Sequence, residues 1–204
     1  MKTALLIYMT IFLAAAQQPA AGDSRPVIVA FGDSLTAGYG LPPGAGYPEQ
    51  LQQRLDARGH RYRVVNMGIS GDTTSGGLAR MKAALELKPA IVILELGAND
   101  GLRGLPVDQM RANLEEMITA FRKSGATVVL AGMTLPRNYG AAYIRSFEQV
   151  FTDLAKKYNL PLIPFFLDGV AGDPKFTLPD FIHPNAEGYR IVTETVMKTL
   201  EPLL

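Results

Sequence analysis

Short apolar runs alternate with amphipathic stretches along the chain from residue 27 onward. The apolar runs cover residues 27–31, 62–67, 90–96, 126–131 and 160–165, and they are rich in Val, Ile and Leu without polar alternation. Strands that are buried on both faces of a sheet have this composition. We therefore predict five β-strands at these positions.

Helical periodicity fills the gaps between the runs, at residues 47–58, 74–87, 107–123, 142–158 and 185–200. Gly59, Gly125 and Asn159 stand where three of these helices are expected to end. Alternating strands and helices predict an α/β fold in which a parallel sheet lies between two helical layers, a three-layer α/β/α sandwich. The 204 residues suit one such domain rather than two.

A serine, Ser34, follows the first apolar run almost directly. In an open α/β sheet the crevice outside the carboxyl ends of the strands binds ligands, so this serine is placed at the reactive end of the predicted fold. One of the two histidines in the chain, His183, lies near the C-terminus, three residues after Asp180. An isolated serine in this position is more often a helix N-cap. An early serine combined with a late Asp-x-x-His favours a serine hydrolase.

Two further polar or glycine positions follow predicted strands. Gly71 comes after the second strand, in the stretch 68–74, and Asn99 comes after the third, in the stretch 97–100. Because the carboxyl ends of parallel strands meet at one edge of a sheet, we expect both residues to lie near Ser34. Each alone would suit a simpler role, as a turn glycine or an Asx turn. Because both residues are expected at the same edge of the sheet as Ser34, the three favour one common site.

The segments around these four residues together resemble the motif blocks of the GDSL (SGNH) hydrolases. The blocks containing Ser34, Gly71, Asn99 and His183 occur in the order of that family, and the resemblance runs from residue 27 to the C-terminus. It is strongest for the thioesterase I / lysophospholipase / arylesterase branch. The resemblance implies a flavodoxin-like five-stranded parallel sheet in the order 2-1-3-4-5. It also implies an oxyanion hole built from the backbone N–H groups of Ser34 and Gly71 and the side-chain amide of Asn99.

The chemistry of a serine nucleophile assigns roles to the C-terminal motif. A serine hydroxyl is weakly nucleophilic until a base takes its proton, and His183 is the expected base, with Asp180 orienting its ring. Pro184 biases His183 away from helical backbone angles and is expected to begin the last helix. Asp33 is expected to be a structural hydrogen-bonding partner, since the resemblance places the catalytic acid at Asp180.

Loops at the same edge are apolar. The stretches 101–106 and 133–139 carry Leu102 and Leu135, which suit an acyl chain and are equally consistent with packing beneath their own loops. The apolar loops therefore favour acyl esters as substrates, and the resemblance to the thioesterase I / lysophospholipase / arylesterase branch implies aryl esters, thioesters and lysophospholipids among them. Two alternatives remain. A carbohydrate O-deacetylase would use the same catalytic set in a shallow polar crevice, and a non-catalytic flavodoxin-like binding module would need no Ser-His-Asp set.

Composition limits which partners and cofactors we expect the protein to bind. The net charge of +1 gives no electrostatic reason to expect nucleic acid binding. The chain has no cysteine and two isolated histidines, so we expect no metal site, and the proposed chemistry needs no cofactor. No Gly-x-Ser-x-Gly sequence is present, which argues against an ordinary α/β-hydrolase fold.

The N-terminus predicts export. Lys2 precedes an apolar run at residues 4–16 that ends in three alanines, which is typical of a cleaved signal peptide and too short for a transmembrane helix. We predict a signal peptide at residues 1–16, a disordered lead-in at 17–25, and a single hydrolase domain at 26–204. Cleavage after Ala21 and an uncleaved anchor are the alternatives. The expected product is a periplasmic or secreted monomer without stable membrane insertion.

Overall fold

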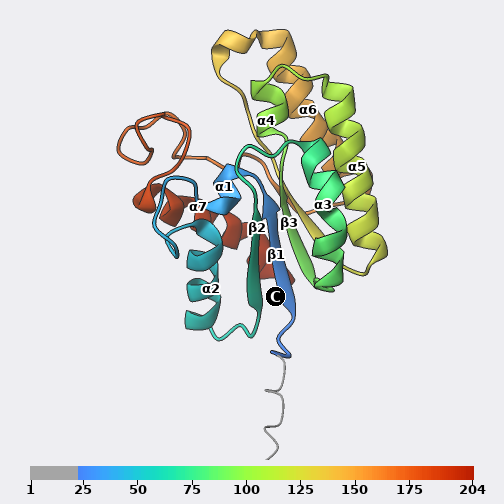
Figure 1. Ribbon diagram of the computed structural model, residues 1–204, viewed down its shortest axis with the longest axis vertical. Helices are drawn as coiled ribbons and strands as arrows, with labels where there is room; N and C mark the ends of the chain where they lie inside the picture. The colour runs from blue at the N-terminus through green and yellow to red at the C-terminus, as the bar shows by residue number, and fades with distance from the viewer. Residues whose placement is uncertain (1–22) are drawn as a thin grey trace, which may run out of the picture.

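The computed structural model describes residues 23–204, and their centre is a five-stranded, all-parallel sheet in the order β2-β1-β3-β4-β5 (Figure 1). The strands are β1 (Val27–Gly32), β2 (Arg63–Gly68), β3 (Ile91–Glu95), β4 (Thr127–Ala131) and β5 (Leu162–Ile163). Every residue of β1 and β3 is buried, because helices cover both faces of the sheet at its centre. The strand order confirms the predicted fold.

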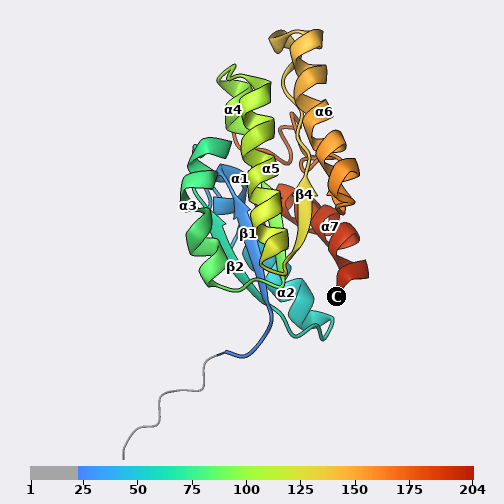
Figure 2. The ribbon, with the colours of Figure 1, turned by 90° about the vertical axis from the view of Figure 1, so that its right-hand side faces the viewer.

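The long helices form two layers (Figures 1 and 2). One layer contains α2 (Tyr47–Ala57) and α7 (Ala186–Leu200), which contact each other; the other contains α3 (Thr74–Glu86), α5 (Val107–Lys123) and α6 (Ala141–Tyr158). Because each helix returns the chain to the start of the next strand, all five strands point their carboxyl ends toward the same edge. The three-layer sandwich predicted from the sequence is confirmed. None of the helices in residues 23–204 has both the length and the apolar character needed to cross a membrane.

Two element boundaries differ from the prediction because of prolines. The fifth strand was expected to cover six residues, but only Leu162 and Ile163 pair with β4, and Pro161 and Pro164 flank them. Proline has no N–H to donate to a ladder, so the strand cannot extend past these positions. Pro184 was expected to begin the last helix and instead forms an isolated bridge before it. The helix is capped by the next residue, an asparagine whose side chain accepts a bond from the N–H of Gly188 at 3.0 Å.

Short helical segments follow the strands at the carboxyl edge. They are α1 (Ser34–Ala37), α4 (Ala98–Leu102) and η1 (Arg137–Tyr139), and a further turn, η2 (Glu201–Leu203), ends the chain. The part of the chain that forms α4 was expected to be a loop. The Asp100 carboxylate accepts the N–H of Thr74 at 2.8 Å and its hydroxyl at 2.6 Å, which ties α4 to the start of α3.

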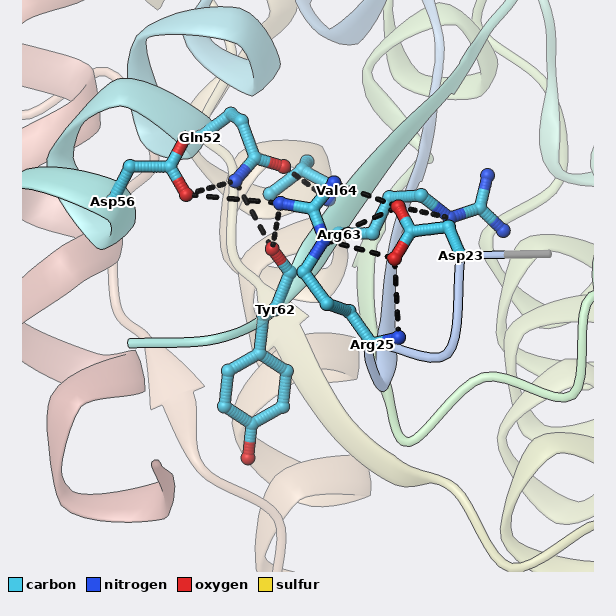
Figure 3. A network of polar contacts seen from close by, with 7 residues as sticks. All are labelled: Asp23, Arg25, Gln52, Asp56, Tyr62, Arg63 and Val64. Carbon is cyan, nitrogen blue, oxygen red and sulfur yellow. Dashed lines mark hydrogen bonds and ion pairs between the residues drawn. The ribbon is translucent and has the colours of Figure 1, made fainter. Parts of the chain in front are cut away.

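Charged side chains join the N-terminal end of the described chain to the edge of the sheet where the strands begin, opposite the carboxyl edge (Figure 3). Arg25 forms an ion pair with Asp23 at 2.7 Å and donates to the Tyr62 carbonyl at 3.3 Å. Arg63, the first residue of β2, lies 3.9 Å from the same aspartate, and Asp56 of α2 lies 3.8 Å from Arg25. Residues 23–25, at the end of the expected lead-in, therefore make defined contacts. The predicted signal peptide lies outside the described residues.

Candidate active site

Ser34 is the first residue of α1, and only Asp33 separates it from the buried strand β1. Asp33 caps this helical turn, since its side chain accepts the N–H of Leu35 at 3.0 Å. The Asp33 side chain is itself buried. The serine is thus held at a helix N-terminus, where backbone N–H groups are not used inside the helix and point toward whatever binds at the edge.

The C-terminal motif folds back onto this serine. His183 Nε2 lies 2.9 Å from Ser34 Oγ, and His183 Nδ1 lies 2.6 Å from Asp180 Oδ2. The second Asp180 oxygen accepts the backbone N–H groups of Ile182 and His183 at 2.9 and 3.0 Å. The three residues that the sequence predicts as a triad are therefore in hydrogen-bond contact in the order Ser–His–Asp, with each ring nitrogen of the histidine facing one partner.

Hydrogen bonds keep the Asp180 carboxylate charged. Partial burial acts to raise its pKa, but the backbone N–H groups of His183 and Ile182 and the histidine ring stabilise the anion and hold the pKa of Asp180 below its usual range. An ionised Asp180 can accept the Nδ1–H of the histidine. This leaves Nε2 as the acceptor that faces the serine hydroxyl.

The other two predicted residues reach the same cavity. A cavity of about 190 Å³ is lined by Ser34, Gly71, Asn99 and His183, together with seven further residues. The Asn99 amide donates one N–H to Asp33 Oδ2 at 2.9 Å, and a primary amide carries two such donors. The contact fixes the direction of the side chain and leaves the second N–H available to a bound oxygen. It also matches the structural role expected for Asp33.

Gly71 adopts a backbone conformation that favours glycine, as a glycine in a turn does. A Cβ at this position would meet Arg103 Nη2 at 3.6 Å, which is ordinary contact, but the φ angle is +81°. A side chain would be strained by that angle rather than by crowding.

An arginine that sequence reasoning missed connects the serine segment to the glycine segment. The Arg80 guanidinium donates to the Gly32 carbonyl at 2.8 Å, to the Met67 carbonyl at 2.7 Å and to the Asp72 carboxylate at 2.7 Å. It also lies 4.0 Å from the centroid of the Phe31 ring. The ends of β1 and β2 and the residue after Gly71 are therefore held by one planar group, which fixes two segments of the site relative to each other.

A buried glutamate beneath the site was also missed. Glu95, the last residue of β3, accepts the Thr36 hydroxyl at 2.8 Å and the Asp33 N–H at 3.3 Å. Burial, with the nearby Asp33 charge as a second cause, raises the pKa of Glu95 well above its ordinary value. Burial also raises the pKa of Asp33 to about 6, against hydrogen bonds from Leu35 and Asn99 that lower it.

These raised pKa values predict how stability depends on pH. A folded state that holds protons more tightly than the unfolded chain is stabilised at low pH, and this stability is lost as pH rises through the folded-state pKa. The free energy of unfolding should therefore fall between about pH 4 and pH values above 6. Glu95→Gln keeps an acceptor for Thr36 and cannot ionise. Urea unfolding at several pH values should show a smaller loss in this variant than in the wild type.

The control for this prediction is Glu86→Gln, which changes an exposed glutamate at the end of α3. Its pH profile should match that of the wild type. If Glu95→Gln also reproduces the wild-type profile, the buried carboxyl is not the source of the pH dependence.

A larger apolar cavity adjoins the catalytic one. It has a volume of about 470 Å³ and is lined by Leu102 and Leu135, together with Met133, Phe165 and Leu167 among others. Four residues line both cavities: Leu35, Ala98, Leu102 and Ile182. The two leucines singled out in the sequence therefore face a groove that continues from Ser34. We name this larger cavity the acyl groove.

The other cavities and side-chain clusters of the described residues give weaker indications of a functional site. An open cleft of about 600 Å³ lies between α5 and α6, away from Ser34, and is lined largely by polar side chains. Within residues 23–204 no cluster of three or more His, Asp or Glu side chains is arranged to hold a metal ion. Tyr39, whose ring centroid lies 4.6 Å from that of His183, is a further neighbour of the triad that the sequence did not indicate.

Comparison with known proteins agrees with this geometry. The family model of the GDSL-like lipase/acylhydrolases matches residues 30–191, which include all the candidate catalytic residues. The chain belongs to this family. It is therefore a hydrolase that acts on ester bonds. The match confirms the resemblance found in the sequence motifs.

Individual relatives extend over nearly the whole chain. The chain is 45% identical to Esterase TesA of Pseudomonas aeruginosa over 98% of its own length and 99% of that protein. It is 37% identical to the Thioesterase 1/protease 1/lysophospholipase L1 of Escherichia coli over 91% of its length and 86% of that protein. The crystal structure of TesA superposes with a TM-score of 0.85 at 46% identity, covering 87% of this chain and 99% of that one.

Proposed function

We propose that this GDSL-family hydrolase cleaves acyl esters and thioesters with Ser34 as nucleophile, His183 as general base and Asp180 as the residue that orients the base. The observation that carries this proposal is the pair of contacts made by the histidine ring, 2.9 Å to the serine oxygen and 2.6 Å to the aspartate. His183 takes the serine proton as Oγ attacks the carbonyl carbon, and the same proton then goes to the leaving oxygen or sulfur. Water hydrolyses the acyl-enzyme by the reverse sequence.

The charge on the tetrahedral intermediate needs donors in the small cavity. We propose the backbone N–H groups of Ser34 and Gly71 and the amide of Asn99, all of which belong to residues lining that cavity. The link between Asn99 and Asp33, and the contacts of Arg80 with Met67 and Asp72 on either side of Gly71, support donors that are already oriented before substrate binds. Donors fixed in this way stabilise charge without reorganisation during the reaction.

The acyl groove favours substrates with a hydrocarbon chain. Its leucine, methionine and phenylalanine side chains suit an acyl group better than a sugar, which would need polar partners. The names of the relatives, an esterase and a thioesterase with lysophospholipase activity, are consistent with aryl ester, thioester and lysophospholipid substrates. A panel of p-nitrophenyl esters, palmitoyl-CoA and a lysophospholipid tests this class. Turnover of acetylated sugars alone would instead favour the O-deacetylase alternative.

Acyl length should control specificity. Each buried methylene contributes about 0.8 kcal/mol, so kcat/KM should rise from acetyl to octanoyl esters until the groove is full, less whatever part of the chain stays in water. Leu135 lines only the larger cavity, whereas Leu102 lines both. Leu135→Gln should therefore flatten the dependence on length and lower octanoyl hydrolysis far more than acetyl hydrolysis. Initial rates across the ester series, normalised to titrated active sites, measure this.

The control for the groove is Leu87→Gln, a partly buried leucine after α3 at the opposite edge of the sheet. It should keep the wild-type dependence on acyl length. A wild-type enzyme that prefers acetyl to octanoyl esters would contradict the assignment of the groove.

We also propose that residues 1–16 are a signal peptide and that the mature enzyme is an exported monomer. The sequence of Lys2 and the apolar run at 4–16 supports this. The described chain enters β1 at the edge of the sheet opposite to that of Ser34. N-terminal sequencing of the exported protein should begin near Gln17, or near Gly22 if cleavage follows Ala21. An intact Met1 in a membrane fraction would contradict cleavage.

A further inference from the structure

The exposed large apolar side chains of the described chain lie at one edge of the sheet. In residues 23–204 they are Tyr39, Ile69, Leu105, Phe181 and Ile182, with exposed fractions between 38% and 53%. We name these five residues the apolar rim. Scattered exposed apolar residues are normal on a soluble protein and need no explanation, whereas a gathering on one face marks a site of interaction.

The topology places the rim around the catalytic cavity. Tyr39 follows α1 at the end of β1, Ile69 follows β2, and Leu105 follows α4 at the end of β3. Phe181 and Ile182 belong to the segment between β5 and α7 that carries the triad histidine. All five therefore lie on segments at the carboxyl edge, the upper end of the molecule in Figure 1. Ile69 and Leu105 line neither the catalytic cavity nor the acyl groove, so substrate binding in those cavities does not explain their exposure.

One member of the rim has a backbone conformation that is rare for a bulky residue. Phe181 has a φ of +60°, a conformation that bulky residues rarely adopt. Its N–H donates to the Leu178 carbonyl at 3.0 Å, and its carbonyl accepts the N–H of Gly172 at 3.3 Å. The ring nevertheless remains 53% exposed. Phe181 also lines the acyl groove, so this exposed ring lies beside the site.

Two exposed arginines lie near the rim. Arg103, two residues before Leu105, is exposed and donates to the Gly71 carbonyl at 2.7 Å beside the catalytic cavity. Arg137 is exposed and lines the acyl groove. Both cations therefore lie next to the opening through which an acyl chain would enter. Apolar and aromatic side chains flanked by arginine suit the boundary between headgroups and acyl chains of an anionic lipid surface.

We propose that the apolar rim docks the enzyme onto the surface of an anionic phospholipid bilayer, with the catalytic cavity facing the lipid. This inference builds on the proposed acyl groove, because the groove opens inside the rim. Docking would let an acyl chain pass from the lipid into the groove without crossing water. The contact is peripheral, through side chains at the surface, and needs no membrane-spanning segment.

Vesicle binding tests the proposal apart from catalysis. The protein carries Ser34→Ala, so that nothing is hydrolysed, and is sedimented with vesicles of phosphatidylglycerol or of phosphatidylcholine. The test variant adds Ile69→Gln and Leu105→Gln, which change exposed residues outside both cavities. We expect the starting protein to bind phosphatidylglycerol vesicles more strongly than phosphatidylcholine vesicles. The double substitution should lower the partition coefficient about tenfold or more, since two large apolar side chains no longer enter the interface.

Matched controls separate a rim effect from a general surface effect. Lys82→Gln with Glu86→Gln replaces two exposed residues on α3 and leaves the net charge unchanged, and it should bind as the starting protein does. With Ser34 intact, the rim variant should keep wild-type kcat/KM on a soluble acetyl ester. The proposed function fails if the enzyme with Ser34 intact shows no esterase activity. The docking surface still stands in that case if the Ser34→Ala protein binds vesicles and the rim substitutions weaken that binding.

Three outcomes would overturn the docking surface. One is the absence of binding to either vesicle, and another is binding that the Ile69 and Leu105 substitutions leave unchanged. The third is a dimer in solution that the same substitutions dissociate, measured by light scattering, because the rim would then be a contact between two copies of this chain.

Discussion

Replacing His183 with alanine is expected to lower kcat for a p-nitrophenyl ester by about 10⁴- to 10⁶-fold, with a much smaller change in KM. The ring is within 2.9 Å of the Ser34 hydroxyl, and without it no side chain takes the proton as the serine attacks. Asp180→Ala should cost less, on the order of 10²- to 10⁴-fold, because the aspartate orients the ring and stabilises its charge without transferring the proton. Stopped or continuous assays with titrated enzyme give these ratios.

The second histidine of the chain provides the control. His60 follows α2 at the opposite edge of the sheet from Ser34, so His60→Ala should retain wild-type kcat. Activity that survives His183→Ala at more than a few per cent would mean that another group acts as the base. Equal losses in the Asp180 and His183 variants would mean that the aspartate does more than orient the ring.

Asn99→Ala is expected to lower kcat about 10²- to 10³-fold while KM changes little, corresponding to about 3–4 kcal/mol of lost transition-state stabilisation. The amide is proposed to bind charge that appears only during the reaction, so the ground-state complex should be almost unaffected. Its existing bond to Asp33 orients it toward the cavity that contains Ser34. Steady-state kinetics with one short and one long acyl ester separate kcat from KM.

Asn138→Ala is a suitable control for this substitution, since Asn138 is exposed on η1. It should leave both kinetic constants unchanged. An effect of Asn99→Ala that is confined to KM would show that the amide binds substrate and is not an oxyanion donor. Circular dichroism of the variant checks that loss of the Asp33 contact has not altered the fold.

The sequence was sufficient to predict the meeting of the site residues because topology brings them together. Ser34, Gly71 and Asn99 each follow a parallel strand, and parallel strands end at one edge. The proximity of Asp180 to His183 followed from a spacing of three residues on an irregular segment. Local motif spacing, combined with the rule that parallel strands end at one edge, was therefore enough to predict which residues line the catalytic cavity.

Residues that support the site could not be predicted in the same way. Arg80 lies in the middle of α3, and its sequence neighbours give no sign that it reaches the ends of β1 and β2. Glu95 ends an apolar strand, and its burial depends on Thr36 and Asp33, which are about sixty residues earlier. The exposed Tyr39 likewise packs on a histidine far along the chain. Each of these contacts depends on how distant segments pack, which periodicity and motif spacing do not record.

The most direct test of the account is covalent labelling of the nucleophile. The wild-type enzyme is treated with a p-nitrophenyl alkylphosphonate, digested and analysed by mass spectrometry, with Ser34→Ala treated in parallel. The account predicts one phosphonyl group per chain on Ser34, loss of esterase activity in proportion to labelling, and neither labelling nor turnover in the alanine variant. Stoichiometric labelling of another residue, or turnover that persists in Ser34→Ala, would contradict it.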